Sequence, residues 1–161
     1  MWARDPAADE RTMPRSDRWD IEVPFHIEID VEAADIDRLQ HVNNAVYLRF
    51  LEQAAWAHTE ALGLDWATYQ ALDAACVVRR HELDYLLPAE LGDRLQVATW
   101  IVDNDGRLTM WRAFQIRRVG DGRTLLRART QYVTVGLSNG RPKRMPQRFV
   151  DAYRPVAEAG G

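Results

Sequence analysis

The chain has 161 residues, of which 47% are hydrophobic and 28% are charged, and its formal net charge is −3. This length is enough to bury one hydrophobic core, and the charge balance does not suggest a nucleic-acid partner. No apolar stretch approaches the roughly 20 residues that cross a bilayer, so we expect no membrane association.

Both ends of the chain are expected to lie outside the folded domain. Residues 1–19 carry charges and prolines but lack the apolar core of a signal peptide, which indicates a flexible leader. Residues 155–161 are expected to fray. Because no internal repeat is present, we predict a single domain over residues 20–154. The lone cysteine, Cys76, excludes an internal disulfide and favours a reducing, cytoplasmic compartment.

The first two predicted elements differ in their hydrophobic period. Residues 21–31 alternate between apolar and mostly charged side chains, which predicts a strand with one buried face. From about Asn44 to Leu62, polar side chains fall on one narrow stripe with helical spacing. This pattern predicts a long helix that the protein encloses on most sides, and Gly63 is suited to end it. Residues 65–74 form either a connector or a short helix.

Four further strands are predicted downstream, over residues 76–87, 94–102, 108–119 and 124–135. Asp105-Gly106 and residues 120–123 are typical of the tight turns that join antiparallel neighbours. Residues 146–153 are expected to add one short helical turn, with Pro146 at its start. The predicted fold class is α+β, a curved antiparallel sheet of about five strands wrapped around one long helix. The outer face of such a sheet is left to solvent or to a partner subunit.

Polar residues crowd between the first strand and the helix, in the run DIDRLQHVNN at residues 35–44. Asn43 is a favoured helix N-cap, and Asp35 or Asp37 could add charge near the positive end of the helix. The same arrangement could carry chemistry, because the first N–H groups of a helix suit an oxygen that becomes negative during a reaction. An upstream carboxylate could attack a carbonyl there or deprotonate a water that does, which is acyl transfer to water.

The run DIDRLQHVNNAVYLRFLE at residues 35–52 resembles the signature of the hotdog-fold acyl-CoA thioesterases, the 4-hydroxybenzoyl-CoA thioesterase-like group. The usual form of that signature is D-x-D, a glycine, HVNN, a tyrosine and a helix. Residues 83–97 also resemble the following strand and turn of the family, and the resemblance covers roughly residues 21–153. It implies the hotdog fold and hydrolysis of acyl-CoA to the free acid and CoA. We expect neither a metal nor another cofactor.

Three residues take catalytic roles by this resemblance. Asp37 matches the catalytic carboxylate of the family, as nucleophile or as general base. The backbone N–H of Asn44 matches the group that polarises the carbonyl. His41 lies where relatives keep a histidine near the thioester, and we expect it to orient the substrate by a hydrogen bond.

Three more residues are expected to contact substrate. Asn43 either positions water or caps the helix, and Tyr47 matches the tyrosine of the family, with helix packing as its other role. Gln40 replaces the usual glycine, which suggests either a different loop conformation or a side chain that enters the site. The other histidines form no metal-binding motif, and we expect His58 to be a core residue.

The resemblance implies a homodimer at least, often a tetramer, with the active site between subunits. Edge strands of an open sheet also favour a partner. Two other functions fit the same residues. One is hydrolysis of acyl groups on a carrier protein, and the other is acyl-CoA binding without catalysis. The proline-containing motifs of hotdog dehydratases are not found.

Overall fold

The computed structural model describes residues 18–158. Along the chain, its helices and strands are β1 (Phe25–Asp30), the 3₁₀ turn η1 (Ala33–Asp35), α2 (Val46–Ala61), α3 (Trp66–Leu72), β2 (Ala75–Tyr85), β3 (Arg94–Asn104), β4 (Thr109–Arg118), β5 (Thr124–Val135) and α4 (Gln147–Ala152). The long helix and all five strands predicted from the sequence are present. The segment after the long helix, which the sequence leaves open, contains the short helix α3.

The strands form one sheet in the order β1-β3-β4-β5-β2, and all neighbours are antiparallel. Hairpins join β3 to β4 and β4 to β5 at the two predicted turns. Gly106 and Gly122 have positive φ angles of 68° and 70° there, which glycine adopts without steric strain. β2 pairs with β5, so the chain crosses from one end of the sheet towards the other between β2 and β3.

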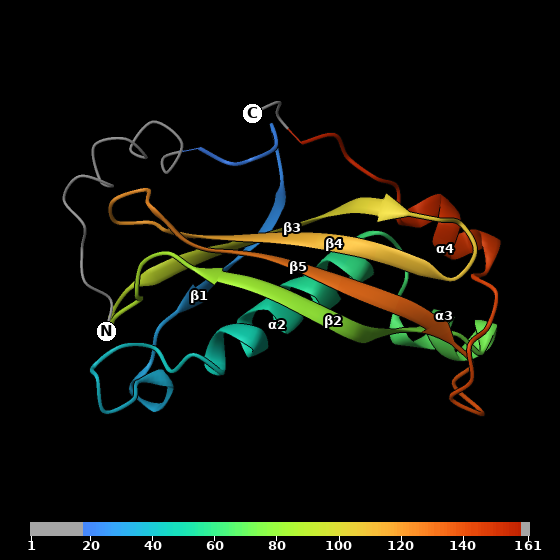
Figure 1. Cartoon of the computed structure of the whole chain (residues 1–161), viewed down its shortest axis with the longest axis horizontal. Helices are drawn as coiled ribbons and strands as arrows, with labels where there is room; N and C mark the ends of the chain where they lie inside the picture. Colours follow the sequence, from blue (N-terminus) through green and yellow to red (C-terminus); the bar gives the residue numbers. More distant parts are fainter. Residues whose placement is uncertain (1–17, 159–161) are drawn as a thin grey trace.

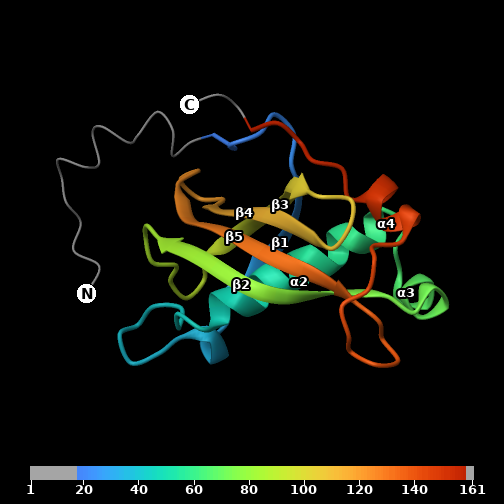
Figure 2. The same cartoon turned by 45° about the vertical axis from the view of Figure 1, so that its right-hand side comes forward.

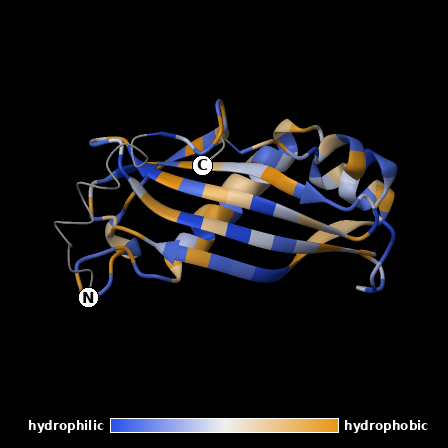
Figure 3. Ribbon diagram, turned by 45° about the horizontal axis from the view of Figure 1, so that its top comes forward, coloured by the Kyte–Doolittle hydropathy of each residue, from blue (hydrophilic) through white to orange (hydrophobic). Residues whose placement is uncertain are grey.

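The sheet curves around α2, which lies across its concave face (Figures 1 and 2). Hydrophobic and hydrophilic residues alternate along the strands, so one face of the sheet is available to pack against the helix (Figure 3). α2 packs mainly on β3 and β1. The largest buried cluster includes Tyr47, Phe50 and Leu51 from α2 and Leu95 and Phe114 from the sheet. The α+β hotdog architecture is confirmed.

A second buried cluster closes the end of the molecule where α3 and α4 lie (Figure 1). Tyr69 of α3 packs its ring 4.8 Å from that of Phe149 of α4, measured between centroids. Asp65 caps α3, with its Oδ1 accepting the Thr68 N–H at 2.8 Å. The predicted helical turn near the C-terminus is confirmed as α4, with Pro146 at its N-cap.

Segments from both ends of the described chain are hydrogen-bonded to the sheet. Gln115 of β4 donates from Nε2 to the Arg18 carbonyl at 2.9 Å, and Arg127 pairs with Asp20 at 2.7 Å. Val156 donates its N–H to the Ile101 carbonyl at 2.8 Å. Hydrogen bonds to the sheet therefore reach Arg18 at one end and Val156 at the other. The rest of the predicted leader, residues 1–17, and residues 159–161 of the predicted tail lie outside the described residues.

Within residues 18–158, every helix is too short or too polar to cross a lipid bilayer.

Candidate active site at the start of α2

A tight loop places Asp37 and His41 next to each other before α2. Ile36 and Val42 form an antiparallel bridge, and the Asp37 N–H donates to the His41 carbonyl at 2.9 Å. The Gln40 N–H donates to the Asp37 carbonyl at 3.0 Å. Val42 is buried, and side chains alternate across such paired segments. Asp37 and His41 therefore face away from the core side on which Val42 lies.

Gln40 has a positive φ of 62° in this loop. That is the left-handed conformation in which glycine is favoured. The backbone therefore adopts the geometry that a glycine would allow at this position. The Gln40 side chain is exposed, and its entry into the site stays a prediction.

The two acids of the D-x-D motif have different surroundings. Asp35 is 6% exposed, and its Oδ1 lies 2.6 Å from Nη2 of Arg49 while its Oδ2 accepts the Glu32 N–H at 3.0 Å. Asp37 is half-buried, and its Oδ1 accepts the Leu39 N–H at 2.8 Å. No protein donor among residues 18–158 reaches the Asp37 Oδ2. Both carboxylate oxygens of Asp35 therefore have protein partners. Asp37 Oδ2 is available to bind another group.

The start of α2 leaves one backbone donor without a partner. The Asn43 N–H donates to the Asp35 carbonyl, the Ala45 N–H to Asn43 Oδ1 and the Val46 N–H to the Asn43 carbonyl. In the part of the chain that the structure describes, the Asn44 N–H has no acceptor. A free N–H at a helix N-terminus is suited to polarise a carbonyl oxygen. The regular helix begins at Val46 with Ala45 before it, and Asn43 Oδ1 accepts the Ala45 N–H, which is the bond that a capping side chain makes.

The loop after β2 holds the start of α2 in place. The Tyr47 hydroxyl accepts the Ala89 N–H at 2.9 Å, and the Ala89 carbonyl accepts the Val42 N–H at 2.9 Å. The Tyr85 hydroxyl donates to the Asn44 carbonyl at 3.0 Å. Tyr47 is buried, and this burial raises its pKa. The structure thus gives Tyr47 a structural role, and substrate contact by Tyr47 remains untested.

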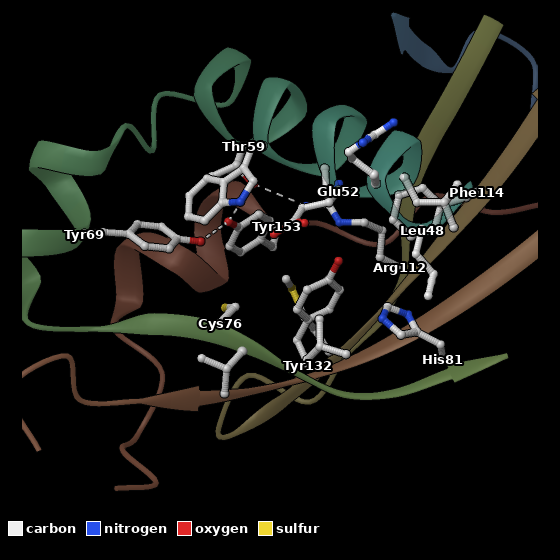
Figure 4. Close-up of a pocket in the computed structure, with 17 residues that line it drawn as sticks. Leu48, Glu52, Thr59, Tyr69, Cys76, His81, Arg112, Phe114, Tyr132 and Tyr153 are labelled. Atoms are coloured by element: carbon white, nitrogen blue, oxygen red, sulfur yellow. Dashed lines mark hydrogen bonds between the residues drawn. The ribbon is translucent and has the colours of Figure 1, made fainter. Parts of the chain in front are cut away.

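A cavity of about 680 Å³ lies between α2 and strands β2, β4 and β5 (Figure 4). Its wall on α2 includes Leu48, Glu52, Ala55 and Thr59, which follow one another at intervals of three or four residues. Asn44 is four residues before Leu48, so it lies on the same face of the helix, one turn beyond the wall. The cavity therefore extends along α2 from the side where the free N–H lies.

The inner end of the cavity is polar and contains a buried arginine. Arg112 of β4 is 1% exposed, and its Nη1 lies 2.7 Å from His58 Nδ1 and 3.2 Å from Thr99 Oγ1. Its Nη2 lies 3.4 Å from Thr59 Oγ1. Burial, helped by the Arg112 charge, lowers the pKa of His58 to about 4. His58 is thus neutral at pH 7, and its Nδ1 accepts a hydrogen bond from Arg112.

Tyrosine hydroxyls extend this polar network. Tyr153 is hydrogen-bonded to Tyr69 and, at 3.0 Å, to Thr59. Burial raises the pKa of Tyr153 to about 12.

Arg112 was missed by the sequence analysis, although it shares the alternating face of β4 with Met110 and Phe114. A charged residue on an otherwise apolar strand face was the signal that could have revealed it.

Residues 31–153 match the family model of the thioesterase-like superfamily, and the chain belongs to this family. Over 81 residues the chain is 37% identical to the long-chain acyl-CoA thioesterase FadM of Escherichia coli K12, covering 50% of this chain and 60% of that protein. The chain thus spans about 60% of the length of the curated relative that it matches.

Solved structures agree with the fold. The YbaW probable thioesterase of Escherichia coli superposes with a TM-score of 0.71 at 25% identity, over 81% of this chain and 99% of that one. Slr0204 of Synechocystis, a 1,4-dihydroxy-2-naphthoyl-CoA thioesterase, gives a TM-score of 0.72 at 23% identity, over 81% and 96% of the two chains.

Proposed function

We propose that the protein hydrolyses an acyl-CoA thioester to the free acid and CoA. The observation that carries this proposal is the free Asn44 N–H at the start of α2, beside the loop that holds Asp37. Membership of the thioesterase-like superfamily and the likeness to long-chain acyl-CoA thioesterase FadM support it.

In this mechanism the thioester carbonyl accepts a hydrogen bond from the Asn44 N–H, which stabilises the negative charge that develops on the oxygen. Asp37 acts in one of two ways. As a general base it takes a proton from water, whose oxygen attacks the carbonyl carbon, and the CoA thiolate leaves and is protonated. As a nucleophile it attacks the carbonyl carbon and displaces the CoA thiolate, which is protonated, and the resulting anhydride is then cleaved by water. His41 orients the thioester, Asn43 holds the water, and Gln40 contacts the substrate.

The acyl group would occupy the cavity along α2. Most of the side chains that line this cavity are apolar or aromatic, which suits a hydrocarbon chain. The CoA part would remain outside, near the loop at residues 37–41. This placement keeps the carbonyl at the helix start while the chain lies against Leu48 and Ala55.

The first test is an Asp37→Ala variant assayed by release of free thiol from acyl-CoA. We expect kcat to fall by roughly 10²–10⁴-fold, because the acid–base or covalent step is lost. Asp103→Asn, at an exposed acid on β3, is the control and should keep the wild-type rate. A folded Asp37→Ala protein with the wild-type rate would remove Asp37 from the mechanism.

Oxygen-labelled water separates the two roles of Asp37. Label in the Asp37 carboxylate after a single turnover identifies the nucleophile. Label only in the released acid, with no acylated Asp37 detected by mass spectrometry, favours the general base.

The same assay tests the rival functions. The acyl chain offered on CoA and on a carrier protein shows which carrier is preferred, and we expect CoA. Tight binding of acyl-CoA over several chain lengths without any thiol release would instead favour a binding protein.

We also propose that the protein forms a homodimer through β2. This strand is at the edge of the sheet, and Val77 and Val78 are 40% and 49% exposed on it. An unpaired strand edge of this kind is a template for another strand. Pairing of two β2 strands would also cover the cavity, because Val77 and Val78 line it.

Sedimentation analysis should give the mass of a dimer or of a tetramer built from dimers. A monomer at micromolar concentration, or a Val78→Pro variant that still dimerises, would contradict this interface.

A further inference from the structure

Arg112 is a buried cation whose protein partners are all neutral. Its guanidinium contacts His58, Thr99 and Thr59, and it lies 5.9 Å and 5.8 Å from the ring centres of Tyr132 and Tyr153. Its Nε–H is buried and has no acceptor within the described chain. No carboxylate of residues 18–158 lies within ion-pairing distance of Arg112. The buried positive charge is therefore held by dipoles and aromatic rings alone.

Such a charge is unfavourable unless a counter-ion is supplied. Burying a charged group without a partner is costly, and buried arginines normally pair with carboxylates through their planar fork of N–H donors. Glu52 is the one acid among the described residues that line the cavity. It is exposed on α2 and makes no ion pair with Arg112. The cavity therefore lacks an anion at a position where its wall provides a cation.

The position of Arg112 sets where on a substrate this anion would be. Arg112 contacts His58, which is fourteen positions after Asn44 in the chain. A helix rises about 1.5 Å per residue, so fourteen residues correspond to about 21 Å along the helix axis between the Asn44 N–H and the turn that Arg112 contacts. An extended chain advances roughly 1.2 Å per bond, so roughly 16 to 18 bonds would span this length. The anion would thus lie at the far end of a long acyl chain.

We propose that the preferred acyl group carries a terminal carboxylate, which Arg112 binds at the inner end of the cavity. This inference rests on the proposed thioester hydrolysis and names its substrate class, a long-chain ω-carboxyacyl-CoA. The Arg112 guanidinium borders the cavity, with Tyr132 on the same wall, and the carboxylate pairs with it there (Figure 4). His58 is neutral and does not compete for the anion. The apolar side chains that line the cavity accommodate the methylene groups.

The test compares two thioesters of equal length, hexadecanoyl-CoA and hexadecanedioyl-CoA attached through one carboxyl. We expect kcat/KM of the wild-type protein to favour the second by roughly tenfold to a hundredfold, as charge-assisted hydrogen bonds do. Arg112→Met keeps the apolar volume and should abolish or reverse the preference. Arg79→Met, at an exposed arginine of β2, is the matched control and should retain it.

Equal kcat/KM of the wild-type protein for the two thioesters would overturn the inference while leaving thioester hydrolysis intact. An unchanged preference in folded Arg112→Met would also overturn it. The wild-type comparison decides the matter if Arg112→Met does not fold. No hydrolysis of either thioester overturns the proposed function instead. In that case, the affinities of the matching S-alkyl-CoA thioethers are measured with and without the terminal carboxyl. Equal affinities would count against binding of the carboxylate by Arg112.

Discussion

Nη2 of Arg49 lies 2.6 Å from Oδ1 of Asp35, and this ion pair joins the first turn of α2 to the segment before the site loop. Asp35 is nearly inaccessible, and the same carboxylate caps the 3₁₀ turn by accepting the Glu32 N–H. The first acid of the D-x-D motif is thus a structural residue. Its neighbour in the motif, Asp37, has only a hydrogen bond from the Leu39 N–H to its Oδ1.

Asp35→Ala is therefore expected to reduce stability more than Asp37→Ala does. Loss of the ion pair and of the cap should lower the free energy of unfolding by about 1–3 kcal/mol. Asp37→Ala should change it by no more than about 0.5 kcal/mol, because its one hydrogen bond is within its own loop. Urea unfolding of both variants measures the difference. Equal losses would show that the two acids share the structural role.

Tyr47→Phe removes the acceptor for the buried Ala89 N–H. Leaving that donor unsatisfied should cost about 1–3 kcal/mol of stability. Tyr85→Phe is the comparison, since its bond to the Asn44 carbonyl is exposed and water can replace it at a smaller cost. Thermal unfolding of the two variants checks the order. A larger loss in Tyr85→Phe would show that the loop is held mainly from that side.

His58 should make stability depend on pH in the acid range. Its folded pKa is about 4, below the usual 6.5, so the unfolded chain binds a proton first as pH falls. The contribution of neutral His58 is fully present above pH 6.5, decreases as pH falls and is lost by about pH 4. The slope is at most about 1.4 kcal/mol per pH unit and is reduced where solvent screens the ring.

His58→Gln isolates this effect, because its side-chain carbonyl can still accept from Arg112 but does not titrate. Urea unfolding between pH 4 and pH 7 should show a flatter pH dependence for the variant than for the wild-type protein. Parallel curves would mean that the pKa of His58 is not lowered in the folded state.

Gln40→Gly should stabilise the protein by about 0.5–1 kcal/mol, because glycine adopts the left-handed backbone without the steric cost that a side chain carries. Gln40→Ala keeps that cost and should show no gain. Thermal unfolding measures both. If Gln40 contacts the substrate, both variants should also raise KM for acyl-CoA, and an unchanged KM would remove Gln40 from the site.

The sequence predicted the local elements well. The period-two strands, the long helix and the two hairpin turns depend on interactions between near neighbours, which the pattern of residues records directly. The polar run before α2 likewise predicted where the candidate site lies. Asn43, the cap candidate of the sequence, accepts the Ala45 N–H with its side chain, and the regular helix begins at Val46.

The sequence by itself determined the fold class and the loop that holds Asp37, His41 and Asn44, since these lie within ten residues of one another. Only the tertiary structure decided which of the two acids is free, that the Asn44 N–H lacks a partner, and that Arg112 meets His58 inside a cavity. These relationships join residues from β4, α2 and the loops. They depend on how the sheet curves around the helix, and long-range packing of this kind leaves little trace in the order of residues along one chain.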